Sequence, residues 1–107
     1  MFDSHYTEST LITMNALTKT ELDAALSDLD GWTVEDDRLK KLFEFDSFRD
    51  AMSFLMRLAF EIEDMNHHPE IENVYNRVRF TLCTHDAGNK VTEKDVKLAQ
   101  RIEALRG

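Results

Sequence analysis

Apolar side chains recur every three or four residues in three stretches of the chain, which predicts three helices. In the first stretch, Thr18 and Glu21 form a capping box, and Gly31 is expected to end the helix. In the last stretch, Thr92 is placed to cap a helix that runs to the end of the chain. The apolar positions of these two helices are Leu22, Ala25, Leu26 and Leu29, and then Val96, Ala99, Ile102 and Leu105.

The middle stretch predicts the longest helix, which begins after a cap at Asp46 or Ser47 and ends near Asn66. It ends there because Pro69 disfavours helical geometry at the residue before it. One stripe of this helix carries Phe48, Met52, Leu55, Ala59 and Ile62. Three more apolar residues fall outside that stripe: Phe54, Met56 and Phe60. Their presence suggests that a second face of the helix is covered in an oligomer.

Two pairs of short segments rich in strand-forming residues separate the helices. Residues 32–35 and 39–45 predict a hairpin that turns at Asp36, Asp37 and Arg38. Residues 71–75 and 77–84 predict a second pair, in which apolar and polar residues alternate. The order is helix, two strands, helix, two strands, helix. It favours an α+β fold with an antiparallel sheet packed under helices.

Composition bounds the kind of protein and its partners. The 107 residues suit one domain, with residues 1–14, which include His5, as an N-terminal tail and residues 15–107 as the domain. A net charge of -8 disfavours nucleic acid as a partner, and no apolar run is long enough for a membrane span. With a single cysteine and no secretory signal, we expect a cytoplasmic protein.

Histidines are the strongest candidates for chemistry, because one imidazole can accept a proton near neutral pH while another donates one. His67 and His68 follow the predicted helix end, and His85 follows the second strand pair, so they meet only if the strand order brings His85 back to that helix. Exposed rings at a helix end remain an alternative interpretation. No metal is expected, because no cysteine pair or helical histidine pair completes a standard zinc set.

Three other residues near the histidines have ordinary explanations. Asp95 lies three residues after Thr92 and can complete a capping box, but an inward-facing acid needs a partner. Glu63 is one of several acids near a helix end, where carboxylates are usually solvated. Cys83 is better explained as a small strand residue than as a nucleophile, since no general base is evident beside it.

Several runs of residues together resemble the signature of the pterin-4a-carbinolamine dehydratase family. They are EDMNHHPE at residues 63–70, NVYN at 73–76, TH at 84–85 and TEKD at 92–95. Weaker agreement extends the match from Gly31 and Trp32 to the last helix. The resemblance implies a single four-stranded antiparallel sheet with three helices on one face.

The resemblance also implies an activity. Members of the family dehydrate 4a-hydroxytetrahydrobiopterin, or a related pterin, to quinonoid dihydropterin during tetrahydropterin recycling after aromatic amino acid hydroxylation. They use no metal or bound cofactor and assemble as homodimers or homotetramers. The implied catalytic residues are His67, His68 and His85, with Glu63 and Asp95 in support. The implied substrate contacts are Asn66, His67, His68, Cys83, Thr84, His85 and Asp86, through side chain or backbone.

Two other functions stay open at this point. A member of the family also stabilises a transcription factor's dimer by binding its helices, so a non-catalytic interaction module is a second hypothesis. Such a role would depend on Phe54 or Phe60 rather than on His68 or His85. A third hypothesis is a chaperone or regulator that acts beside a hydroxylase or in pterin cofactor synthesis.

Overall fold

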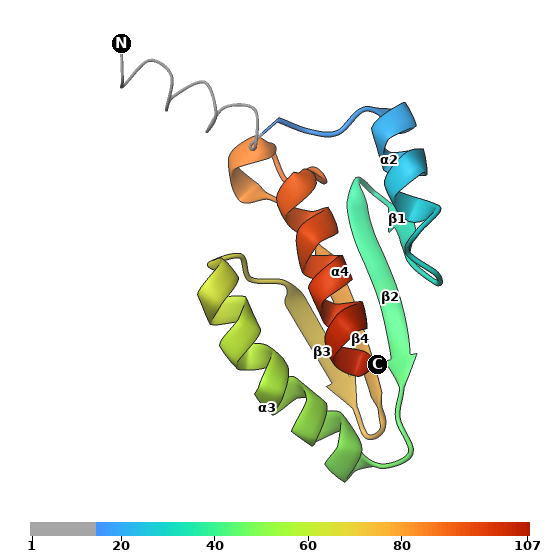
Figure 1. Cartoon of the computed structure of the whole chain (residues 1–107), viewed down its shortest axis with the longest axis vertical. Coiled ribbons are helices and arrows are strands. Elements are labelled where there is room, and N and C mark those ends of the chain that lie inside the picture. Colours follow the sequence, from blue (N-terminus) through green and yellow to red (C-terminus); the bar gives the residue numbers. More distant parts are fainter. Residues whose placement is uncertain (1–14) are drawn as a thin grey trace.

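The computed structural model describes residues 15–107, which form three α-helices and four strands (Figure 1). The elements follow the predicted order, with one short 3-10 helix added before the last α-helix. The predicted tail lies outside the described residues. The elements are α2 (Lys19–Leu26), β1 (Thr33–Glu35), β2 (Arg38–Glu44), α3 (Phe48–Met65), β3 (Glu70–Val74), β4 (Arg77–Leu82), η1 (His85–Ala87) and α4 (Glu93–Arg106).

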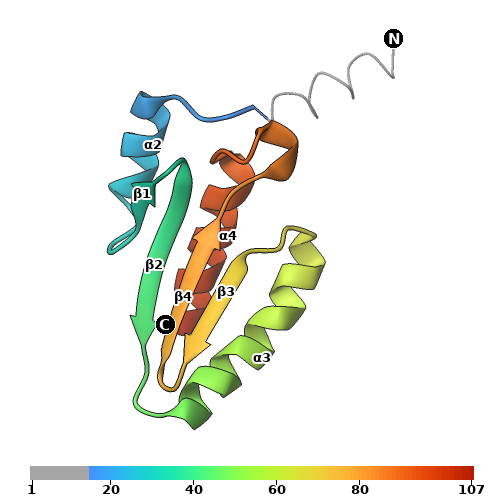
Figure 2. The same ribbon diagram turned by 180° about the vertical axis from the view of Figure 1, so that it is seen from behind.

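The four strands form one antiparallel sheet in the order β1-β2-β4-β3. The last strand in the chain, β4, therefore lies between β2 and β3. Helix α4 crosses one face of the sheet, and the strands lie in front of this helix when the molecule is viewed from behind (Figure 2). The predicted fold class, a four-stranded antiparallel sheet with three helices on one face, is confirmed.

Alternation along the strands separates a core face from an open face, because successive side chains point to opposite sides of a sheet. Val78, Phe80 and Leu82 of β4 are fully buried beneath the helices. The residues between them, such as Arg79 and Thr81, point to the open face, together with Lys40 of β2. The alternation predicted for this strand is confirmed. Glu70, at one end of the open face, follows the two histidines His67 and His68 closely in the chain.

Local signals place the ends of the helices in most cases. Thr18 and Glu21 form the predicted capping box, and Ser47 caps α3 by accepting a hydrogen bond from the Asp50 N–H. The expectation that Gly31 ends the first helix is wrong, because α2 ends at Leu26. Gly31 instead lies in a later turn with φ of +83°, a conformation that favours glycine.

The first hairpin turns through Asp36 and Asp37, which have φ of +52° and +61°. Two consecutive residues with positive φ produce a two-residue hairpin turn, and aspartate tolerates this conformation better than most residues do. Arg38 was expected in the turn but already belongs to β2, where the turn leaves it beside the end of β4.

The face that α3 buries differs from the predicted stripe. Its buried residues are Ala51, Phe54, Leu58 and Ile62, so the predicted stripe was right for Ile62 and wrong in leaving out Phe54, which faces the core of the same chain. Phe54 packs against Phe45 and Phe80, with ring centroids 5.2 Å and 6.3 Å away. Met56 and Phe60 do lie outside the buried face, with exposed fractions of 66% and 69%.

Replacing Leu58 by Ala should lower the free energy of unfolding by about 2–5 kcal/mol, because Leu58 is fully buried and its loss leaves a cavity. The matched change Met56→Ala, two residues earlier on the same helix, should alter it by less than about 0.5 kcal/mol. Urea unfolding of both variants measures the difference. Equal destabilisation by the two changes would contradict the face assigned to α3.

Candidate active site

The three predicted histidines approach each other at one end of the sheet. Helix α3 ends at Met65, the left-handed conformation of its cap residue Asn66 turns the chain toward β3, and His67 and His68 occupy that turn. His85 begins η1, just beyond the end of β4. Since β3 and β4 are neighbours and Glu70 pairs with Thr81, these two connections lie side by side. A hollow of about 280 Å³ is lined by Asn66, His67, His68, Cys83, Thr84, His85, Asp86 and Lys94.

Behind His67 lies the carboxylate of Asp95, which is completely buried in the first turn of α4. Asp95 Oδ1 is 2.6 Å from His67 Nε2. Asp95 Oδ2 accepts hydrogen bonds from the Thr92 N–H and from the Thr84 hydroxyl, each 2.9 Å long. Asp95 therefore completes the capping box and also binds a histidine, so both expectations for this residue apply together.

The directions of these hydrogen bonds can be followed from one group to the next. The Thr84 hydroxyl donates to Asp95, so it accepts from the Thr92 hydroxyl at 2.7 Å. The Thr92 hydroxyl oxygen in turn accepts from the Lys94 N–H. Two donors thus point at Asp95 Oδ2, which leaves Oδ1 to His67. Where Oδ1 accepts a hydrogen bond from Nε2, a neutral His67 ring has Nδ1 left as an acceptor.

The other two histidines are held less firmly than His67. The His67 side chain is 12% exposed, whereas that of His68 is 59% exposed. His68 Nε2 lies 3.3 Å from Glu63 Oε1, and the Glu63 side chain is 82% exposed, so the pair contributes little to stability. His85 is exposed as well, and no side-chain hydrogen bond to it is recorded in residues 15–107. One ring is fixed and two are open to solvent.

The predicted substrate contacts divide by what their side chains can reach. Thr84 is buried and lines the hollow, but its hydroxyl is used by Asp95 and Thr92, and its backbone N–H and oxygen bond to other backbone groups of the chain. Cys83 is half-buried and lines the hollow. Burial raises the pKa of the Cys83 thiol, and the carboxylates of Asp95 and Glu70 act in the same direction, while Arg38 opposes them. A protonated thiol is a poor nucleophile.

Sequence reasoning missed two contributors to this site. Lys94 lines the hollow, although the resemblance gave this residue of the TEKD run no role. Thr92 was expected only to cap α4, but its hydroxyl also orients Thr84. In residues 15–107, no group of three or more His, Cys, Asp or Glu side chains is arranged to hold a metal ion. Nor is any helix there long and apolar enough to cross a membrane.

Comparison with known proteins gives a consistent family match. A family model described as Pterin 4 alpha carbinolamine dehydratase matches residues 15–105. A protein of Opitutus terrae, provisionally named as a pterin-4-alpha-carbinolamine dehydratase, is 55% identical over 89 residues, which cover 83% of this chain and 92% of its own. A protein of Christiangramia forsetii with the same provisional name is 43% identical over 92 residues, covering 86% and 94%.

Two solved structures are also similar. A Brucella melitensis protein, described as a transcriptional coactivator/pterin dehydratase, superimposes with a TM-score of 0.82 at 42% identity, covering 87% of this chain and all of its own. A pterin dehydratase-like protein, identified as a RuBisCO assembly factor in the alpha-carboxysome, gives a TM-score of 0.59 at 30% identity, covering 71% and 87%. Proteins of this fold are therefore described with roles beyond dehydration.

Alkylation of Cys83 by iodoacetamide should be slow at pH 7 and should still be accelerating at pH 9, because the raised pKa keeps the thiol protonated. A free cysteine, with a pKa of about 8.5, is the reference for the pH profile. Mass spectrometry at a series of pH values measures the rate, and Cys83→Ala controls for labelling elsewhere. A rate that levels off near pH 7 would show a reactive thiolate and contradict the assignment.

Proposed function

The chain belongs to the pterin-4a-carbinolamine dehydratase family, and from this premise we propose that it dehydrates a 4a-hydroxytetrahydropterin. The substrate is 4a-hydroxytetrahydrobiopterin or a close relative, and the product is the quinonoid dihydropterin of tetrahydropterin recycling. One observation carries the proposal: three histidines line a single hollow, and a buried carboxylate holds one of them.

The reaction needs two proton transfers at opposite ends of one bond system. The C4a–O bond breaks, the oxygen keeps the electron pair, and an acid gives it the proton that completes a water molecule. A base takes the proton from the adjacent ring nitrogen, and the freed electron pair forms the new C=N bond. General acid and base catalysis of this kind typically contributes about 10²–10⁴-fold in rate.

We assign the base to His67. In this assignment Asp95 accepts a hydrogen bond from the Nε2–H group, so Nδ1 is the atom that can accept the proton from the pterin nitrogen. The imidazolium that results is stabilised by the carboxylate 2.6 Å away, in the way that a buried aspartate supports histidine in other enzymes. Asp95 is thus a positioning residue in this proposal, and it does not touch the substrate.

The acid is one of the two remaining rings. His68 and His85 both line the hollow, and both are open enough to exchange protons with solvent between turnovers. Glu63 supports His68 from the outer side. Protein side chains make every proton transfer in this scheme, so the proposed reaction requires no metal or cofactor. The pterin would rest on Asn66, Cys83, Thr84 and Asp86, which line the hollow with the histidines.

We further propose that the protein is cytoplasmic and works as a homodimer or homotetramer in the pathway of an aromatic amino acid hydroxylase. The exposed apolar residues of α3, Met56 and Phe60, are the candidate surface for self-association. The same surface supports the second candidate function, a protein-interaction module. Descriptions of similar proteins as a coactivator and as an assembly factor favour keeping that candidate.

Purified protein should accelerate the loss of freshly generated 4a-hydroxytetrahydropterin. His67→Ala, which removes the proposed base, should lower kcat by about 10²-fold or more. Of His68→Ala and His85→Ala, the variant that removes the acid should lower kcat by a similar factor. Stopped-flow absorbance follows the conversion. His5→Ala is the matched control, as the fourth histidine of the chain. If the wild type behaves like buffer, the proposed activity is wrong.

Replacing Phe60 by Ser should weaken self-association and any partner binding while leaving the dehydratase kcat within about twofold, since Phe60 lies on the exposed face of α3. Sedimentation velocity measures the assembly. Phe54→Ser, suggested by the sequence for the same purpose, is unsuitable because Phe54 is in the core. An unchanged sedimentation coefficient in Phe60→Ser and Met56→Ser would exclude α3 as the contact surface.

A further inference from the structure

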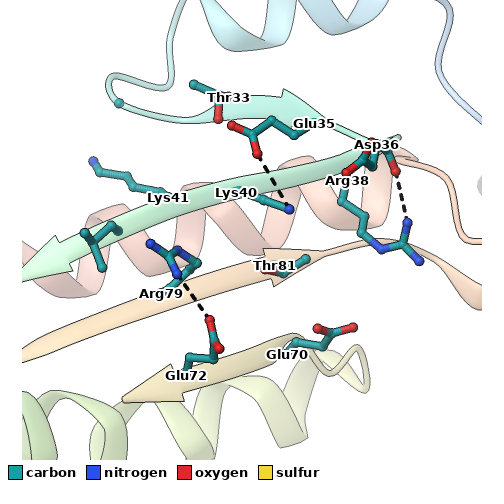
Figure 3. A pocket seen from close by; sticks show the side chains of 12 residues that line it. Thr33, Glu35, Asp36, Arg38, Lys40, Lys41, Glu70, Glu72, Arg79 and Thr81 are labelled. Carbon is teal, nitrogen blue, oxygen red and sulfur yellow. Dashed lines mark hydrogen bonds and ion pairs between the residues drawn. The ribbon is translucent and has the colours of Figure 1, made fainter. Parts of the chain in front are cut away.

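A second, larger depression lies on the open face of the sheet, and its lining side chains are shown in Figure 3. This sheet groove measures about 660 Å³. Leu39 pairs with Leu82, so the preceding residue, Arg38, lies beside Cys83. Cys83 lines the hollow while Arg38 lines the groove. On the other side of β4, Glu70 pairs with Thr81 and also lines the groove.

The charged groups of the sheet groove are not all engaged alike. Most are paired, since Lys40 lies 3.7 Å from Glu35 and Arg79 lies 3.3 Å from Glu72 (Figure 3). Arg38 and Glu70 make no salt bridge within residues 15–107. Arg38 gives one hydrogen bond to the backbone oxygen of Asp36, at 3.0 Å, and its guanidinium has further N–H groups to donate.

Arg38 and Glu70 thus stand as one donor group and one acceptor group at the end of the groove nearest Cys83. A guanidinium only donates hydrogen bonds, and a carboxylate only accepts them. A hydroxyl can satisfy both, because it accepts one bond and donates another. A methyl substituent can satisfy neither.

We propose that Arg38 and Glu70 form a subsite that selects pterins with an uncharged, hydroxylated substituent at C6. The inference rests on the proposed function, since the pterin ring must first occupy the hollow of the histidines. Its substituent would then pass over Cys83 and reach the two charged side chains. Both are specificity-determining residues in this account, and neither takes part in proton transfer.

A phosphorylated substituent fits the same groove less well. The residues that line it include four acids and four bases, Glu35, Asp36, Glu70 and Glu72 against Arg38, Lys40, Lys41 and Arg79, so their formal charges cancel. A phosphate beside Arg38 would also approach Glu70 and be repelled by it. Neutral hydroxyl groups avoid that repulsion and still use both partners.

Equilibrium binding of stable pterins tests the subsite without relying on turnover. Isothermal titration should show wild-type protein binding 7,8-dihydrobiopterin, which carries a dihydroxypropyl group, about tenfold more tightly than 7,8-dihydro-6-methylpterin. Arg38→Met and Glu70→Ala should each remove most of that preference and leave the affinity for the methyl compound within about twofold. Lys40→Ala is the matched control on the same face, and it should keep the preference.

Several results would overturn the subsite. If wild-type protein binds the two pterins equally tightly, the subsite is overturned and the proposed function is not. The same holds if Arg38→Met loses affinity for both pterins by the same factor while it unfolds at the wild-type temperature. Tighter binding of a phosphorylated dihydropterin than of the diol would replace hydroxyl recognition with charge recognition. Failure of both pterins to bind overturns the proposed function as well. Selective binding without turnover would leave the subsite standing and contradict only the dehydratase activity.

Discussion

The buried carboxylate of Asp95 is the group on which the rest of this site depends. An unpaired charge in such a place would cost several kcal/mol, so its partners must all be present in the folded chain. They come from three places: Thr92 at the start of α4, Thr84 beyond the end of β4, and His67 after α3. The hydrogen bonds form together only when sheet and helices are correctly assembled. The correct fold and the orientation of His67 therefore both depend on the hydrogen bonds of Asp95.

That constraint leaves the three histidines in unlike states, and the proposed chemistry uses the difference. The contact with Asp95 holds the His67 ring in one orientation, as a base must be held if it is to take a proton from a fixed atom. His68 and His85 are exposed, as an acid must be if solvent is to return its proton. The register of the sheet also places Arg38 and Glu70 where the C6 substituent of a pterin bound in the hollow would extend.

Features fixed by near neighbours in sequence could be predicted, and features fixed by distant packing could not. The capping boxes and the alternation of Val78 with its neighbours are local, and both are found. The covered face of α3 was predicted wrongly because apolar residues occupy most of its circumference, so packing against Phe80 decides which ones are buried. The histidine hollow required the strand order, in which β4 returns between β2 and β3. The resemblance named the histidines and the two supporting carboxylates, but not the hydrogen bonds from Thr84 and Thr92 that hold Asp95.

The most direct test of this account is the dehydratase kcat of Asp95→Asn. An amide of the same shape keeps an acceptor for the Thr92 N–H, but its NH₂ group faces His67 Nε2, which forces the ring proton onto Nδ1 and removes the base. We expect kcat to fall by about 10²-fold or more while circular dichroism shows the fold intact. A folded Asp95→Asn protein with wild-type kcat would contradict the central claim that this carboxylate sets the state of His67.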